Sequence, residues 1–253
     1  DNENQTIVFT GTTYLLTVNG VTIDAVTGTA HTIAFDGGSS ANDGFNISGD
    51  SITVKGLYLY NFDGEALTTK AIDITSTADS TTIDQNVMGL QTDGTTVNAN
   101  TKGVATAGND TSITNNTISG NTVAGIVLMN GATDVTITGN KIGTDTGGTL
   151  DKGNGADGIW VVTVGATNDM NGGNGGVEGL VIGGGTSALR NTISGNNGDG
   201  IDIGYDGTDT IGGTIKIQGN YIGVGSNGTT SLGNSGDGIM TTGKLTGGAS
   251  NSL

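Results

Sequence analysis

The stretch Ile113-Thr114-Asn115-Asn116-Thr117-Ile118 decides the fold, because its pattern Ile-x-x-Asn-x-Ile returns along the chain. Further copies lie at 83–88, 137–142 and 217–222, a degenerate copy at 188–193, and an early copy at 54–59 with Leu57 in place of the asparagine. Each copy alternates apolar and polar residues, the period of a strand with one buried face. A unit that returns every 20 to 50 residues or so indicates a solenoid, whose coils bury their apolar faces by stacking.

A second repeated phrase, Gly-Asn-x-x-Asp-Gly-Ile, marks another corner of each coil. It stands at 153–159, 195–201 and 233–239, and a version with alanine for aspartate stands at 120–126. The glycine before the isoleucine permits the positive φ or close approach that a corner needs. These corners and their earlier counterparts are 22 to 42 residues apart, so the shortest coil has about 22 residues. The excess is expected to leave the stack as loops, at 163–176, 144–151 and 225–231.

Together the repeats predict an all-β, single-stranded parallel β-helix (β-solenoid) of about eight coils. We expect one domain, 1–253. Residues 1–49 form irregular N-terminal coils with four short strand-like runs, and 50–253 form regular coils with loop insertions.

Composition narrows the classes of partner. The chain has 49 glycines, no proline and no cysteine, and its 24 acidic and 8 basic residues give a net charge of −16. That charge disfavours nucleic acid as a partner. No apolar run reaches the ~20 residues of a membrane span, so no membrane insertion is expected. Without proline every backbone N–H can donate, including those at sheet edges, although turn geometry alone also excludes proline.

The run from Ile182-Gly183-Gly184 through Asn191-Thr192-Ile193-Ser194-Gly195-Asn196 to Gly198-Asp199-Gly200-Ile201 resembles right-handed parallel β-helix repeat proteins, and more narrowly large secreted bacterial or archaeal surface proteins. The resemblance covers roughly residues 50–253. It implies a right-handed winding and an extracellular or cell-surface location. It also implies that asparagines stack as an internal ladder at one bend, here Asn86, Asn116, Asn140, Asn191 and Asn220. A carboxamide both donates and accepts, so stacked copies satisfy one another.

Asp157, Asp199 and Asp237 fall at the same corner of successive coils. If they stack in register their charges repel, and calcium, which prefers hard oxygen ligands, is a candidate to bridge them. The alternative is a solvated column of turn-forming aspartates. No other cofactor is expected. Sequons at Asn4, Asn46, Asn109, Asn115 and Asn227 are candidate glycosylation sites, although a chain this rich in Asn and Thr contains some by chance.

Catalysis is not expected. β-Helix lyases cluster arginines or lysines, whereas this chain has one arginine, Arg190, and seven scattered lysines. The motifs of the β-helix hydrolases, which need a close pair of carboxylates, are absent. The single histidine, His31, has no nearby nucleophile or paired carboxylate in the sequence.

The first functional hypothesis is a non-catalytic extracellular structural protein that polymerises end to end, since solenoids normally need terminal caps and neither end of the sequence reads as one. A fragment of a larger surface protein explains the ends equally well. The alternative from another class is a glycan-binding or glycan-cleaving module, such as an adhesin or a lyase-like domain, with surface glycans as partners and a groove lined by aromatics and carboxylates. Ice or mineral binding through flat threonine rows has fragments such as Thr136-Ile137-Thr138 behind it.

Overall fold

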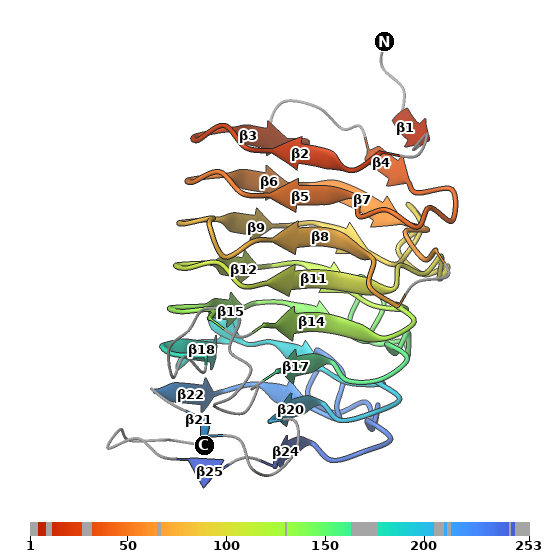
Figure 1. The fold of residues 1–253 in the computed structure, drawn as a ribbon. Coiled ribbons are helices and arrows are strands. Elements are labelled where there is room, and N and C mark those ends of the chain that lie inside the picture. The colour runs from red at the N-terminus through yellow and green to blue at the C-terminus, as the bar shows by residue number, and fades with distance from the viewer. Residues whose placement is uncertain are drawn as a thin grey trace.

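The computed structural model describes residues 5–8, 12–26, 32–64, 67–129, 131–162, 177–204, 210–211, 214–242 and 244–245. This part of the chain consists of short strands joined by turns, with one 3-10 turn, η1 (Ser187–Leu189). Three parallel sheets run the length of the stack (Figure 1). The predicted right-handed parallel β-helix of about eight coils is confirmed. None of the described segments is a helix of the length and apolarity that crossing a membrane requires.

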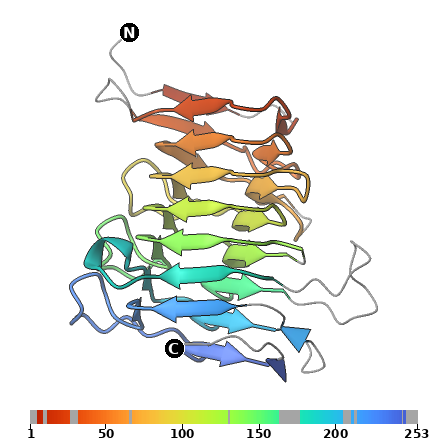
Figure 2. The same cartoon turned by 90° about the vertical axis from the view of Figure 1, so that its left-hand side faces the viewer.

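Each sheet takes one strand from each successive coil, and Figure 2 shows the strands stacked coil upon coil. The first sheet contains β1 (Gln5–Val8), β4 (Ile33–Asp36), β7 (Leu57–Tyr60), β10 (Val87–Met88), β13 (Thr117–Ile118), β16 (Lys141–Ile142), β19 (Thr192–Ile193) and β23 (Tyr221–Ile222). The second contains β2 (Tyr14–Leu16), β5 (Phe45–Ile47), β8 (Lys70–Ile74), β11 (Lys102–Thr106), β14 (Ala124–Leu128), β17 (Ile159–Val161), β20 (Ile201–Ile203) and β24 (Ile239–Thr241). The third contains β3 (Thr22–Asp24), β6 (Thr53–Lys55), β9 (Thr82–Asp84), β12 (Ser112–Thr114), β15 (Thr136–Thr138), β18 (Leu180–Gly183) and β22 (Ile215–Gln218). A separate pair joins β21 (Thr210–Ile211) to β25 (Lys244–Leu245).

The core consists of columns of equivalent side chains, one from each coil. In the second sheet Val104, Ile126 and Ile159 lie in register and are fully buried. In the third sheet Ile83, Ile113 and Ile137 do the same. Burying a side chain of this size contributes about 1.5–3 kcal/mol, and a coil gains it only when its neighbours cover it. The alternation seen in the sequence therefore sets both the inward face and the register.

The first two coils pack differently from the rest. Their strands pair in register with the later ones, so residues 1–49 contribute to the same three sheets. Here, however, the buried residues include the aromatic rings of Phe35 and Phe45, and the exposed ring of Tyr14 packs on both, with centroids 5.2–5.6 Å apart. The more irregular sequence of this region reflects a core of larger side chains.

Loops leave the stack between the first and second sheets on every other coil. Each is closed by an antiparallel bridge, Leu90 with Val97, Thr144 with Asp151, and Val224 with Ser231. The last two are the insertions expected at 144–151 and 225–231. The loops also bond to one another, since the N–H of Thr146 donates to Gly94 O and that of Ser226 to Gly148 O. These bonds link the three loops to one another outside the stack.

Candidate functional site

The five asparagines predicted from the resemblance form a continuous buried ladder at the bend between the third and first sheets. Asn116 shows the repeating unit. Its backbone N–H and its Nδ2 both donate to Asn140 Oδ1, at 2.8 and 3.0 Å, and Nδ2 also donates to Ile83 O. The same bonds link Asn86 to Asn116, Asn140 to Asn191, and Asn191 to Asn220. The Oδ1 of each asparagine thus accepts the backbone N–H and the Nδ2 of the ladder asparagine in the coil before it.

The ladder has two different ends. At the start Leu57 takes the column position and donates only its backbone N–H to Asn86 Oδ1, at 3.0 Å, as expected for a residue that interrupts the ladder. Register carries the same column through Ile33 to Gln5. At the other end Asn220 is half-buried and accepts from Asn191. No later coil in the described part of the chain offers its N–H an Oδ1.

A second buried ladder, which the sequence analysis missed, lies at the bend between the first and second sheets. Its members are Asn100, Asn121, Asn154, Asn196 and Asn234. Asn121 Nδ2 donates to Asn154 Oδ1 at 2.8 Å, and Asn154 Nδ2 donates to Asn196 Oδ1 at 2.8 Å. Phe62 ends this ladder as Leu57 ends the first, by donating its N–H to Asn100 Oδ1.

The signal for the second ladder was present in the corner phrase. Four of its asparagines follow the glycine that opens Gly-Asn-x-x-Asp-Gly-Ile or its variant. The glycines and aspartates of that phrase predicted a corner, whereas its asparagines were assigned no role. Asn100 stands outside the phrase, so periodicity alone would have found four of the five.

The aspartates of the corner phrase do lie in one column. Asp157 Oδ1 accepts the N–H of Asp199 at 2.7 Å, and Asp199 Oδ1 accepts the N–H of Asp237 at 2.5 Å. Each carboxylate therefore caps the corner of the next coil. Within the described residues, no three acidic, histidine or cysteine side chains form a group suited to a metal ion. Calcium at these carboxylates stays a prediction.

Asp202, in β20, faces this column from the outer side of the second sheet. Its Oδ1 is shielded from solvent and has no hydrogen-bond partner in the described part of the chain. Burial, together with the negative charges of Asp157 and Asp199, raises the pKa of Asp202 to about 6. Burial also raises the pKa of Asp157, against the hydrogen bond from Asp199. The carboxylates of Asp157, Asp199 and Asp202 thus concentrate negative charge at this corner.

Another charged group lies on the outer side of the second sheet, nearer the first coils. Lys70 Nζ lies 3.7 Å from a carboxylate oxygen of Asp43 and 3.4 Å from one of Asp73, while Lys102 is the next residue along the Lys70 column. Burial, reinforced by the charge of Lys70, lowers the pKa of Lys102, and burial raises the pKa of Asp43. These two lysines, expected to be scattered, are brought together by stacking. Both aspartates are already held in ion pairs.

The sequon asparagines occupy different environments. Asn109, Asn115 and Asn227 are exposed, while Asn46 is half-buried on β5 with its Nδ2 donating to Asp73 at 3.1 Å. Asn227 closes its own turn by accepting the N–H groups of Thr229 and Thr230. Exposure makes the first three accessible, and glycosylation stays a prediction for all. Asn4, His31 and the insertion at 163–176 lie outside the described residues.

Comparison of the chain with models of protein families, with curated proteins and with solved structures finds no match in any of the three. The resemblance of its repeats to secreted surface proteins therefore stays an interpretation of the sequence. The site is defined by its own geometry: two neutral ladders inside and charged columns outside.

Proposed function

We propose that this protein is a non-catalytic structural element of an extracellular or cell-surface assembly, in which copies of the chain stack head to tail. The observation that carries the proposal is the register of the coils. Three sheets run through the stack, and each of the two asparagine ladders repeats one residue type at one position over five successive coils. A repeat of this kind can be extended by any coil with a matching face.

Groups on the outermost described coils support this extension. In inner coils a strand bonds to the coil on either side: the N–H of Ile201 donates forward to Gly238 O, and that of Thr242 donates back to Ile203 O. Successive N–H groups of a strand alternate in direction, so the N–H of Thr241 in β24 faces away from the stack. At the opposite end β2 pairs with β5 alone among the described strands, so its other edge has no described partner. Edges of this kind template pairing with another strand.

The ladder column supports a second copy as the partner. Asn220 is the last rung of this column among the described residues, and it accepts from Asn191 without an Oδ1 beyond it for its own N–H. In a head-to-tail stack the first coil of one copy lies next to Asn220 of another. Heterologous contacts that do not close into a ring produce a filament. Further coils of a longer chain would satisfy the same backbone groups at the ends of the stack. The assembly state of the purified chain distinguishes this alternative from head-to-tail stacking.

The test is the assembly state of the purified chain, measured by sedimentation velocity and electron microscopy over a wide concentration range, with and without a chelator. We expect species that lengthen with concentration. Thr241→Pro removes the forward-facing N–H without removing a bond to any described residue, and should return the protein to monomers. Thr241→Val keeps that N–H and should assemble like the parent. A parent that is a folded monomer at every concentration would remove the polymer hypothesis.

A second candidate function, binding to a crystalline surface, is favoured by the outer side of the third sheet. Five hydroxyl residues form one column in register: Thr22, Thr53, Thr82, Ser112 and Thr136. Their hydroxyls make no hydrogen bond to the described residues, and strand spacing places them about 4.8 Å apart. A regular row of free hydroxyls suits a surface that itself repeats, such as ice or a mineral.

Ice recrystallisation measured with the parent and two variants tests this candidate. Thr82→Lys places a charge in the middle of the column and should abolish any inhibition. Thr92→Lys makes the same change at an exposed loop residue and should leave the inhibition of ice recrystallisation unchanged. Equal inhibition by both variants, or none by the parent, would exclude ice as the surface.

A further inference from the structure

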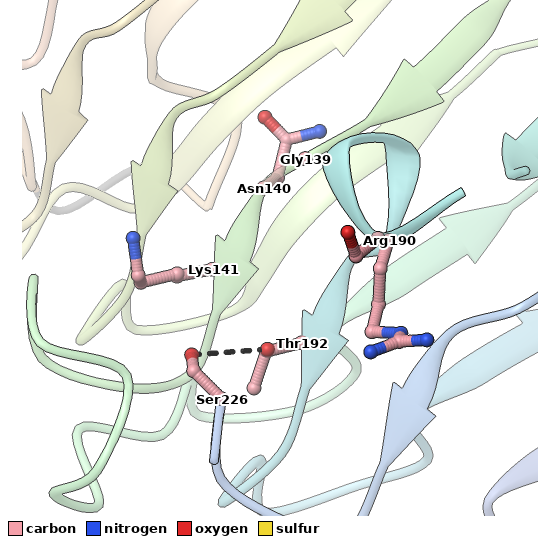
Figure 3. Close-up of a pocket in the computed structure, with 7 residues that line it drawn as sticks. Gly139, Asn140, Lys141, Arg190, Thr192 and Ser226 are labelled. Atoms are coloured by element: carbon pink, nitrogen blue, oxygen red, sulfur yellow. Dashed lines mark hydrogen bonds between the residues drawn. The ribbon is translucent and has the colours of Figure 1, made fainter. Parts of the chain in front are cut away.

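A pocket on the outer side of the first sheet is flanked by two of the chain's eight basic residues, whose charged ends point in different directions (Figure 3). Lys141 comes from β16, and Arg190 follows η1. The hydroxyls of Ser187, Thr192 and Ser226 complete the lining of a cavity of about 200 Å³. No carboxylate lines it. In a chain with three times as many acidic as basic residues, a pocket lined by two cations and no acid is an unusual local composition.

The two cations are not used in ion pairs. Lys55 pairs with Asp24, and Lys70 with Asp43 and Asp73, but neither Lys141 nor Arg190 forms an ion pair with any described residue. Both side chains are half-buried, so part of their hydration has already been removed. Their positive charge is therefore available to a ligand.

Arg190 is held in place by groups that leave its outer nitrogens free. Its Nε donates to Gly219 O at 2.9 Å, and the guanidinium lies 4.1 Å above the ring of Tyr221. A guanidinium has five N–H donors in a rigid fork, and the four on its terminal nitrogens make no hydrogen bond to the described residues. A fork fixed in this way matches two oxygens of one anion.

The hydroxyls add neutral donors beside the cations. Thr192 follows Lys141 in the same column of the first sheet, and its Oγ1 lies 3.1 Å from Ser226 Oγ, the bond drawn in Figure 3. Asn140 also borders the pocket, but its carboxamide is fully used within the ladder. Hydrogen-bond donors therefore line the pocket, and the Oδ1 of Asn140 beside it already accepts hydrogen bonds from Asn116.

We propose that this pocket binds a single oxyanionic group, a sulfate, phosphate or carboxylate, carried by a small ligand such as an acidic or sulfated sugar. Its volume is below the roughly 300–1,000 Å³ of ordinary small-molecule sites, which suits one anionic end group. The net charge of −16 repels polyanions, so a long acidic chain is disfavoured as the ligand. The site is independent of head-to-tail assembly.

Titration followed by NMR chemical shifts, with sodium sulfate against sodium chloride at equal ionic strength, tests the site. We expect shifts at the pocket with sulfate only and an affinity in the millimolar range. Arg190→Gln should weaken binding at least about tenfold, because it removes the charge-assisted bonds of the guanidinium, and Lys141→Gln should weaken it less, because it removes a positive charge from the other side of the pocket. Lys216→Gln removes the same charge from an exposed position on β22 and should leave the affinity unchanged.

Two further arms identify the source of the anion. Glucuronic acid compared with glucose, and glucose 6-sulfate compared with inorganic sulfate, show whether the sugar adds affinity. Tighter binding of the sugar acids assigns the pocket to glycans, and equal binding assigns it to a free anion. Arg190→Lys, with a thermal melt of every variant, separates lost binding from lost folding. Sulfate affinity that is unchanged in correctly folded Arg190→Gln and Lys141→Gln variants, or the absence of any sulfate-specific shift, would overturn the proposal.

Discussion

The asparagine ladder and the aspartate column solve the same problem with different chemistry. Asn140 Oδ1 accepts the N–H of Asn116 at 2.8 Å, and Asp157 Oδ1 accepts the N–H of Asp199 at 2.7 Å, so each oxygen serves the backbone of a neighbouring coil. Asn140 is 1% exposed, whereas the aspartates are half-buried or, at Asp237, exposed.

The difference lies in what the rest of the side chain can do. A carboxamide also donates, so every asparagine hands a bond to the next and the column stays neutral however long it grows. A carboxylate only accepts, so each added aspartate adds a charge that repels its neighbours. Buried columns can therefore be built of asparagine, while aspartate columns are confined to the surface and become sensitive to pH.

The largest expected effect comes from moving a carboxylate into the ladder. Asn140→Asp keeps the acceptor but replaces the donor to Asn191 with a buried negative charge, and should lower the free energy of unfolding by about 3–5 kcal/mol at pH 7. Asn220→Asp, at the half-buried outer rung, should cost much less. Urea denaturation of both variants measures the difference. Equal losses of unfolding free energy in the two variants would mean that burial is not the reason why the inner column is built of asparagine and the outer one of aspartate.

Truncation in the second ladder should rank next. Asn154→Ala leaves the N–H and Nδ2 of Asn121 without an acceptor, at a cost of about 2–4 kcal/mol. Asn234→Ala makes the same change at the half-buried outer rung, where water can replace part of what is lost, and should cost about 1 kcal/mol. Denaturant midpoints compare the pair. A small effect at Asn154 would show that the second ladder, unlike the first, is dispensable.

Removing charge from the aspartate corner should be stabilising at neutral pH. Because the folded pKa of Asp202 is raised to about 6, the unfolded chain ionises first as pH rises, and the contribution of this group to stability falls between about pH 4 and 6. Asp202→Asn should remove that fall and add about 1 kcal/mol at pH 7, a figure reduced for solvent screening. Melting temperatures at pH 4 and pH 7 measure it. Asp237→Asn, at the exposed end of the column, is the control and should change the profile little.

The smallest effect concerns the residue before the ladder asparagine, which has a positive φ in four of the five rungs, Arg190 being the exception. Gln85 holds φ 55° and Asn115 holds φ 56°, where the equivalent Gly139 holds φ 69°. Gln85→Gly should stabilise the fold by about 0.5–1 kcal/mol, since glutamine adopts this region at a cost. Each substitution removes one side-chain hydrogen bond to Asp84. Asn115→Gly should nevertheless add less stability than Gln85→Gly, because asparagine tolerates positive φ. Chemical denaturation ranks the two, and a larger gain at Asn115 would contradict the strain argument.

The first ladder was predicted residue by residue because a repeat family with the same phrase suggested it, and Leu57 was correctly expected to interrupt it. The second ladder was missed although Asn121, Asn154 and Asn196 recur just as regularly. The pocket between Lys141 and Arg190 had no signal at all, because these residues are 49 positions apart and only the stacking of two coils makes them neighbours.

Sequence by itself determined that this chain winds into stacked parallel coils, since alternating aliphatic strands that return with the same corner phrases bury their apolar faces by stacking. It also determined which residue types recur at each corner. Only the tertiary structure decided which of those recurring polar residues lie inside and which lie outside. The reason is physical: burial of a side chain depends on the coils above and below it, and those coils come from segments tens of residues away.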